Sequence, residues 1–345
     1  MSSSHPVAQA ASSSQPTPER IFDLINAHQN SAALKAATDL DVFTAIGEGN
    51  QDAASIAKRC KTSERGMRIL CDFLVMTGLL TKSGSRYGLA PDAALFLDRR
   101  SPASMATLPS FLLSPFMIEA FQDLAAAVRK GGTVASEEGT LAPENPLWVE
   151  FARNMAPLMA FPAELIAGLL VASEGKKWKV LDIAAGHGLF GIALARHNPN
   201  AEIVALDWPN VLEVAKENAA AAGVAGRYRV MPGSAFDVEY GAGYDVVLLT
   251  NFLHHFDVPT CETLLRRVHA ALAPGGRAVA LEFVPNEDRV SPPVAAKFSM
   301  MMLGTTPSGD AYTHSQYQSM FRNAGFKTCA LHTLPIPEQI VVAEK

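Results

Sequence analysis

Residues 180–188 read Val-Leu-Asp-Ile-Ala-Ala-Gly-His-Gly, an apolar run that ends in a turn with two glycines and leads into a helix-like segment. Glycines let the backbone of such a turn approach a ligand, and the free N–H groups of the following helix can hold polar groups. Gly186, Gly188 and Gly191 match the G-x-G-x-x-G pattern of dinucleotide-binding loops, with Asp207 about 20 residues further on. By itself, this motif is also compatible with a nicotinamide dehydrogenase and with a turn that has only a structural role.

The sequence after residue 173 alternates between two kinds of segment. Short β-rich runs at 180–183, 201–207, 228–232, 244–250 and 277–284 are interleaved with helix-like segments at 189–197, 211–222 and 260–272. This alternation predicts an α/β fold whose parallel sheet has helices on both faces. The last two apolar runs, 328–334 and 339–344, are joined by so short a link that they predict an antiparallel hairpin.

The N-terminal part of the chain has a different pattern. Residues 52–59 and 63–80 read as two helices joined by a turn, and 82–89 as two short strands, which together predict a winged helix. Ser63 is the expected N-cap of the second helix. The domains expected from these patterns are a disordered tail at 1–18, a winged-helix domain at 19–100, a helical connector at 101–172 and the α/β domain at 173–345.

Composition excludes several classes of protein. The 345 residues are 48% apolar and 18% charged, as in a globular protein, and the net charge of −5 argues against binding to nucleic acid through phosphate neutralisation. The four cysteines are scattered, so we expect reduced thiols and no metal site. Residues 1–18 do not resemble a secretory signal, and no apolar run has the length of a membrane span, so we expect a cytoplasmic protein.

Further motifs follow the successive β-rich runs. Asp182 ends the first run, Asp207-Trp208 ends and follows the second, and residues 233–236 follow the third. In this order the motifs resemble those of class I S-adenosylmethionine-dependent methyltransferases. More narrowly, the chain resembles the dimeric small-molecule O-methyltransferases, in which a winged-helix dimerisation domain precedes a Rossmann-like, seven-stranded catalytic domain with an antiparallel C-terminal strand. The resemblance covers about residues 19–345.

The resemblance implies that S-adenosylmethionine is the cofactor. The residues that it places around this cofactor are Asp182, Gly186, Gly188, Asp207, Trp208, Gly233, Ser234, Ala235 and Phe236. Three positions depart from the family pattern: Ala184 replaces the first glycine of the loop, Ser234 replaces an aspartate beside the adenine, and Thr250 replaces a lysine found in some members. Core packing is the alternative for Trp208 and Phe236.

Two histidines follow the fourth β-rich run, at the sheet edge where such folds bind ligands. Methylation of a phenol needs a proton acceptor, and a neutral imidazole suits this role. The resemblance aligns His254 with the family's general base and Glu282 with the carboxylate that orients it. His255 as the base and a structural histidine pair remain alternatives. Ala311 stands where the family often has a second glutamate.

Apolar side chains are expected around the acceptor, the small molecule that receives the methyl group. Phe151, Met155 and Met159 recur every four residues, and the later segment 298–302 adds further apolar side chains, of which we expect Phe298 and Met302 to contact the acceptor. Methionine adapts to flat ligands, although core packing is the alternative for each one. The sequence thus predicts O-methylation of a small aromatic molecule.

The sequence also leaves other functions as alternatives and predicts an oligomeric state. The alternatives are C- or N-methylation on the same scaffold, then an NAD(P)-dependent oxidoreductase, then a winged-helix DNA-binding regulator. Many positions of the candidate recognition helix are apolar. This pattern favours a homodimer built by residues 19–97 over DNA binding. No partner other than the small acceptor and the second copy is expected.

Overall fold

The structure is a computed structural model that describes residues 16–345, so residues 1–15 of the predicted tail lie outside the described residues. The chain divides into two compact units, up to Asp98 and from Arg99 onward. The helices at 101–172, expected as a connector, therefore belong to the same compact unit as the sheet. The first described helix, α1 (Glu19–Asp39), begins directly after the segment expected as the tail.

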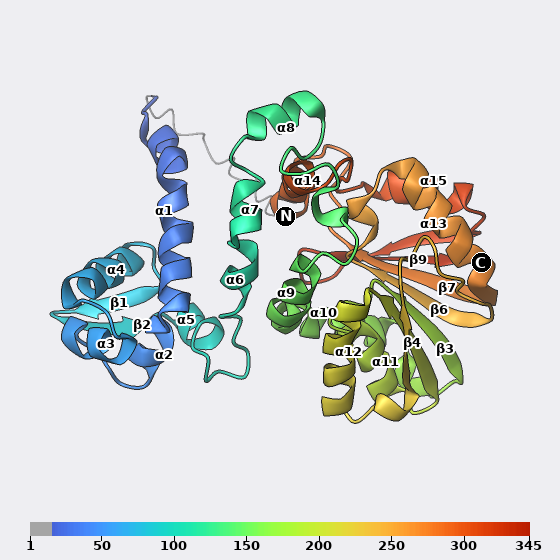
Figure 1. Ribbon diagram of the computed structural model, residues 1–345, viewed down its shortest axis with the longest axis horizontal. Helices are drawn as coiled ribbons and strands as arrows, with labels where there is room; N and C mark the ends of the chain where they lie inside the picture. The colour runs from blue at the N-terminus through green and yellow to red at the C-terminus, as the bar shows by residue number, and fades with distance from the viewer. Residues whose placement is uncertain (1–15) are drawn as a thin grey trace, which may run out of the picture. The chain divides into compact units, whose positions relative to one another are not determined.

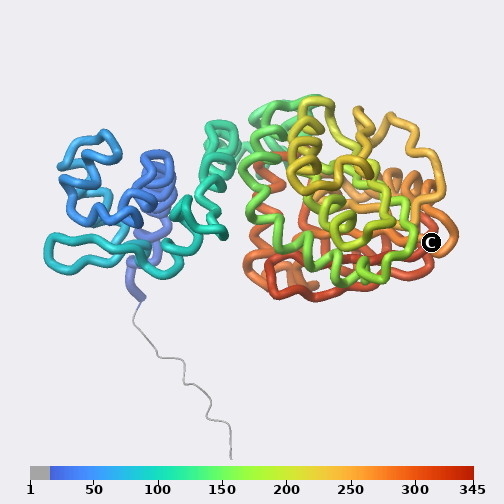
Figure 2. The backbone as a smooth tube through the Cα atoms, turned by 90° about the horizontal axis from the view of Figure 1, so that it is seen from below, coloured from blue at the N-terminus to red at the C-terminus, as the bar shows by residue number. Residues whose placement is uncertain are grey.

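The N-terminal unit has the helix-turn-helix and wing that its sequence predicts. It contains α1, α2 (Val42–Gly47), α3 (Ala53–Cys60), α4 (Glu64–Met76), the strands β1 (Leu80–Ser83) and β2 (Arg86–Leu89), and α5 (Pro91–Phe96) (Figures 1 and 2). Asp52 caps α3, and the Ser63 side chain accepts a hydrogen bond from Gly66 N, as expected of the N-cap of α4. The second helix ends at Met76, earlier than expected, because Gly78 adopts a φ of +80° and reverses the chain before β1.

The second unit is built on a seven-stranded sheet in the order β5-β4-β3-β6-β7-β9-β8. The strands are β3 (Trp178–Ile183), β4 (Ala201–Asp207), β5 (Tyr228–Pro232), β6 (Tyr244–Thr250), β7 (Leu272–Glu282), β8 (Thr328–His332) and β9 (Gln339–Glu344). The first five are parallel, whereas β9 pairs antiparallel with both β7 and β8. The predicted fold class and C-terminal hairpin are confirmed.

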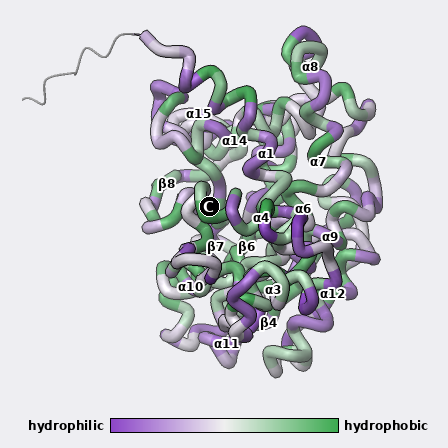
Figure 3. The backbone as a smooth tube through the Cα atoms, turned by 90° about the vertical axis from the view of Figure 1, so that its left-hand side faces the viewer, coloured by the Kyte–Doolittle hydropathy of each residue, from purple (hydrophilic) through white to green (hydrophobic). Residues whose placement is uncertain are grey.

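Helices cover both faces of this sheet (Figure 1). One face packs against α10 (Ala156–Leu169), α11 (Leu189–His197) and α12 (Pro209–Ala221), and the other against α13 (Val258–Ala271) and α15 (His314–Asn323). The remaining helical segments are α6 (Leu108–Leu112), α7 (Pro115–Glu119), α8 (Leu124–Lys130), α9 (Leu147–Asn154), α14 (Pro293–Thr305) and the 3-10 turns η1 (Gly139–Leu141), η2 (Ala172–Glu174), η3 (Ala225–Arg227) and η4 (Leu253–His255). The strands β6 and β7 are largely apolar, as the hydropathy colouring of Figure 3 shows, and they contribute buried side chains to the core on both faces of the sheet.

The fifth strand differs from its predicted bounds. β7 begins at Leu272 rather than 277 and ends at Glu282 rather than 284. Leu272 pairs with Tyr244, and the register then shifts so that Arg277 pairs with Val246. Gly275 adopts a φ of +75° within this irregular stretch, a conformation that glycine accepts readily. The Pro-Gly-Gly segment, residues 274–276, thus lies inside β7, and the register shift accommodates its extra residues.

No helix within residues 16–345 combines the length and the apolar character that crossing a bilayer requires.

Candidate active site

The predicted site residues converge on one edge of the sheet. Asp182 lies near the end of β3, Asp207 ends β4, and Glu282 ends β7, while η4 directly follows β6. These parallel strands all finish at the same edge, where doubly wound sheets bind ligands. The fold alone therefore assembles residues that are up to about a hundred positions apart in the chain.

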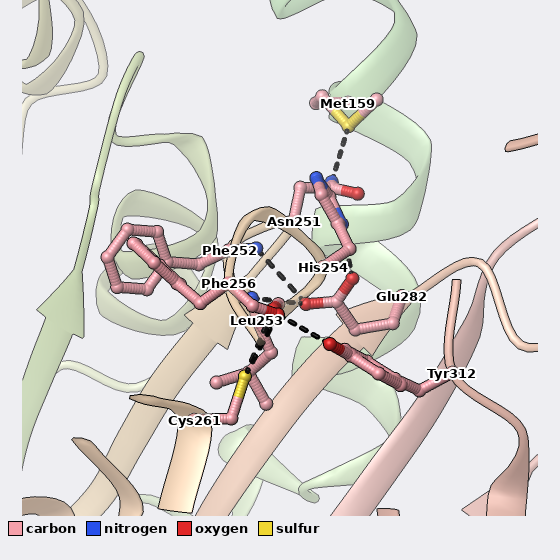
Figure 4. Close-up of polar contacts among 9 residues, drawn as sticks. All are labelled: Met159, Asn251, Phe252, Leu253, His254, Phe256, Cys261, Glu282 and Tyr312. Atoms are coloured by element: carbon pink, nitrogen blue, oxygen red, sulfur yellow. Dashed lines mark hydrogen bonds and ion pairs between the residues drawn. The ribbon is translucent and has the colours of Figure 1, made fainter. Parts of the chain in front are cut away.

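His254 and Glu282 form a buried pair at this edge (Figure 4). The His254 Nδ1 and the Glu282 Oε2 are 2.5 Å apart, and the two residues are 3% and 0% exposed. The other carboxylate oxygen, Oε1, accepts hydrogen bonds from the backbone N–H groups of Phe252 (3.1 Å) and Leu253 (2.9 Å). Glu282 thus holds both the imidazole and the turn that carries it.

This contact determines what the imidazole of His254 can do. An ionised carboxylate only accepts hydrogen bonds, so Nδ1 carries the hydrogen and Nε2 of a neutral ring keeps its lone pair. The adjacent carboxylate also stabilises the ring once it is protonated. The contact with Glu282 therefore leaves the Nε2 of His254 as the ring atom with a free lone pair.

Apolar side chains lie beside His254. The ring of Phe298 meets the imidazole edge-on at a centroid distance of 4.8 Å, and the ring of Phe283 stacks on Phe298 at 4.0 Å. Asn251, three residues before His254, directs its Nδ2 at the Sδ of Met159, 3.5 Å away, as Figure 4 shows. Phe298 and Met159 were predicted to contact the acceptor. Phe283 was not singled out in the sequence.

The other predicted acceptor contacts occupy two places. Met155 is buried in an apolar cluster with Phe111 and Leu147, against which Phe151 also packs. The ring of Phe151 stacks with that of His187 at a centroid distance of 6.2 Å, which places it beside the glycine loop. Met302 is buried in α14, one turn beyond Phe298. Met155 and Met302 are therefore core residues, and their contact with the acceptor stays a prediction.

His255 has a different environment from His254. Its ring lies 5.2 Å from that of Trp148, and its Nδ1 has no hydrogen-bond partner among the described residues. Burial, and then the neighbouring His254, lower the pKa of His255 well below its usual range. The ring is therefore neutral, and its packing against Trp148 favours a structural role over that of a base.

The two aspartates of the cofactor motif organise the glycine loop. Asp207 accepts hydrogen bonds from the N–H groups of Gly186 (2.8 Å) and Trp208 (2.7 Å), and Asp182 accepts one from Gly191 N (3.1 Å). Burial raises the pKa of Asp182 to about 7 and that of Asp207 to about 6. The Oδ1 of Asp182 has no partner among the described residues.

The loop itself requires small residues in unusual conformations. Gly186 and Gly188 have φ values of +56° and +75°, and a Cβ at Gly188 would come within 2.5 Å of Tyr228 Oη. Ala184, which stands where the family has glycine, also adopts a left-handed conformation with a φ of +54°. That conformation costs an alanine about 1–2 kcal/mol.

The third cofactor motif follows β5. Gly233 has a φ of +136°, and the Oγ of Ser234 accepts a hydrogen bond from Phe236 N (3.1 Å). Ala235 is buried, and Phe236 packs edge-on against Phe256 at 5.0 Å. Trp208 is partly buried against an apolar cluster formed by α9 and α12. Both aromatic side chains therefore pack on the protein and are only partly buried.

The residues at this edge fit a cofactor of the S-adenosylmethionine type. A carboxylate offers about four lone-pair sites, so Asp207 keeps acceptor capacity for ribose hydroxyls after accepting two backbone N–H groups. The partnerless Oδ1 of Asp182 is an acceptor of the kind that an ammonium group would meet. By contrast, residues 16–345 contain no cluster of three or more His, Cys, Asp or Glu side chains that could hold a metal ion.

Comparison with known proteins decides the family. Residues 171–327 match the model of the O-methyltransferase domain, and residues 22–99 match the O-methyltransferase dimerisation domain. A protein of Nostoc punctiforme assigned to the O-methyltransferases has 57% identity and a TM-score of 0.93, covering 96% of this chain and 100% of its own. This chain belongs to the O-methyltransferase family. The nicotinamide alternative is thereby set aside.

Two further relatives of this O-methyltransferase have named acceptors. The 3-hydroxy-5-methyl-1-naphthoate 3-O-methyltransferase of Streptomyces sahachiroi is 28% identical over 89% of either chain. Human N-acetylserotonin methyltransferase, solved with S-adenosylmethionine, has the same fold with a TM-score of 0.84 at 23% identity, covering 97% of this chain and 99% of its own. The predictions of an S-adenosylmethionine-dependent methyltransferase and of its cofactor are confirmed.

Proposed function

We propose that this O-methyltransferase methylates a hydroxyl group of a small aromatic molecule, with His254 as the general base. The observation that carries the proposal is the buried contact between His254 Nδ1 and Glu282 Oε2, which leaves Nε2 to accept a proton. Both named relatives act on aromatic acceptors, a hydroxynaphthoate and N-acetylserotonin. The flat rings of Phe283 and Phe298 beside the imidazole suit an acceptor of the same kind.

Each residue of the site has a distinct role in this proposal. When bound, S-adenosylmethionine supplies a methyl group that its sulfonium activates toward an oxygen nucleophile. Asp182, Asp207 and the glycine loop bind this cofactor. His254 takes the hydroxyl proton at Nε2, and Glu282 keeps the ring oriented and stabilises its protonated form. Met159 and the phenylalanines exclude water from the acceptor.

The acceptor atom can be tested directly. The enzyme would be incubated with S-adenosylmethionine carrying a ¹³C-labelled methyl group and with phenols, anilines and N-heterocycles of matched ring size. We expect the label on oxygen, and NMR of the products locates it. Label found only on carbon or nitrogen would contradict the proposed reaction and leave the family assignment intact.

Asp207→Asn is expected to weaken cofactor binding. Losing charged hydrogen bonds to ribose hydroxyls costs about 1.5–3 kcal/mol, or roughly 10- to 150-fold in Kd. Because burial raises the pKa of Asp207 to about 6, wild-type affinity should also fall as the pH drops through about 6. This step should be absent in the variant, whereas protonation of Asp182 near pH 7 should affect both proteins alike. Calorimetry with S-adenosylhomocysteine measures both effects. Glu202→Gln, at the start of the same strand, is the control, and equal losses in both variants would refute the role of Asp207.

We also propose that the chain forms a homodimer through residues 19–97. Helix α1 leaves Phe22 and Ile25 58% and 61% exposed, and residues 22–99 match the dimerisation domain. A double substitution of both residues to Glu is expected to yield a monomer, because two charges would have to be buried in the interface. Light scattering at micromolar concentration, with Gln29→Glu on the same helix as control, measures this. A monomeric wild-type chain would rule the dimer out.

A further inference from the structure

Glu338 is a second buried carboxylate at the sheet edge that carries His254. It is 4% exposed, and its Oε1 has no hydrogen-bond partner among the described residues. Buried polar atoms are nearly always paired, and a partnerless carboxylate oxygen destabilises the fold. Such an atom needs an explanation beyond packing.

The sheet register places Glu338 beside the catalytic pair. Gln339, the first residue of β9, pairs with Glu282, the last residue of β7. Glu338 therefore precedes β9 at the level of the strand end that holds His254. Its carboxyl group interacts electrostatically with both Glu282 and His254.

Strand alternation indicates on which face Glu338 lies. Ile340 and Val342, which follow it at intervals of two, pack in the same apolar cluster as Met159. Met159 contacts the side chain of Asn251, three residues before His254, as the dashed line in Figure 4 shows. Alternation thus assigns Glu338 to the face of the sheet on which Met159 packs, whereas Gln339 continues the opposite face.

The segment that carries Glu338 is held in place. The Gln339 side chain accepts a hydrogen bond from Leu334 N (2.9 Å) and donates one to Ile336 O (3.3 Å). Pro335 and Pro337 further restrict the backbone between these contacts. Burial, followed by the charge of Glu282, raises the pKa of Glu338, and the carboxyl group stays available as a hydrogen-bond acceptor in either protonation state.

We propose that Glu338 binds the acceptor by accepting a hydrogen bond from a second hydroxyl or N–H group on the ring that His254 deprotonates. This inference rests on the proposed function and narrows its substrate class to aromatics that carry a second hydrogen-bond donor. Glu338 determines which acceptor is chosen, and His254 performs the proton transfer. The bound substrate thereby supplies the hydrogen-bond partner that Glu338 Oε1 lacks among the described residues.

The test uses matched acceptors that differ by one hydroxyl group: 1,3-dihydroxynaphthalene against 1-naphthol and 2-naphthol. For the wild type, Glu338→Gln and Glu338→Leu, we would measure kcat/KM and, in parallel, calorimetric binding of each probe to enzyme saturated with S-adenosylhomocysteine. In Glu338→Leu the preference for the diol is expected to fall by about 10- to 150-fold, as for a lost hydrogen bond to a charged group. Glu338→Gln keeps an acceptor oxygen and should therefore retain part of the preference for the diol.

Thermal unfolding separates this role from a structural one. Replacing a buried, partnerless carboxylate by Leu should leave Tm unchanged or raise it, whereas a structural role predicts a lower Tm. Glu344→Gln, at the far end of β9, is the control and should leave the diol preference unchanged. An equal loss on the diol and the naphthols, or an unaltered preference, would overturn the inference. Failure of the wild type to methylate any of the probes would instead count against the proposed function, while the binding measurements still decide the role of Glu338.

Discussion

His254→Ala is expected to lower kcat by about 10²- to 10⁴-fold, the range that general acid–base catalysis supplies. The variant removes Nε2, the nitrogen that the contact between Nδ1 and Glu282 leaves for the hydroxyl proton. The affinity for S-adenosylhomocysteine should change little, because the cofactor motifs lie at the ends of β3, β4 and β5. Single-turnover kinetics with saturating cofactor measures the effect on the chemical step.

His255→Ala serves as the matched control for this prediction. The two rings are adjacent, with centroids 4.4 Å apart, but the His255 ring packs against Trp148. We expect this variant to lose stability through the cavity it creates and to retain most of its turnover. If His255→Ala lost the larger share of turnover, the assignment of the base would be reversed.

Glu282→Leu is expected to lower the free energy of unfolding by about 3–5 kcal/mol, the usual cost of breaking a buried charged pair. It removes the partner of His254 and also leaves the backbone N–H groups of Phe252 and Leu253 without their acceptor. Denaturant unfolding followed by tryptophan fluorescence suits this measurement, since all three tryptophans lie within the unit from Arg99 onward.

Two further variants distinguish the role of Glu282 in orienting His254 from its contribution to the stability of the fold. Glu282→Gln keeps acceptor capacity for the two N–H groups but loses the charge, so it should retain more stability than Glu282→Leu and still lower kcat. Glu287→Ala removes an exposed carboxylate that accepts hydrogen bonds from Thr313 and Ser315, and a much smaller loss of stability is expected. A Glu282→Gln enzyme with wild-type turnover would show that the charge is dispensable.

Local sequence signals predicted most of the architecture because they act over short distances. The apolar run before Gly186, the N-cap at Ser63 and the short link between β8 and β9 each constrain the backbone within a few residues. The position of His254 after β6 followed from the rule that parallel strands end at a common edge. These features needed no knowledge of tertiary contacts.

Features that depend on contacts between distant parts of the chain were harder to predict from the sequence. The early start of β7 depends on a register shift against β6, to which no periodicity in its own sequence points. Glu338 follows two prolines in a loop-like segment, and only the pairing of Gln339 with Glu282 brings it to the site. Likewise, the left-handed conformation of Ala184 is imposed by the loop against the residue's own preference.

The central claim, that His254 accepts the hydroxyl proton, is tested most directly by varying the acidity of the acceptor. Wild type and His254→Ala would be compared in single turnovers on a series of phenols of similar size, from alkylphenols to nitrophenols that are largely ionised at the assay pH. We predict a large deficit of the variant on the weakly acidic phenols that shrinks toward the wild-type rate as the acceptor ionises without help. A deficit that stays constant across the series would contradict the role of His254 as the base.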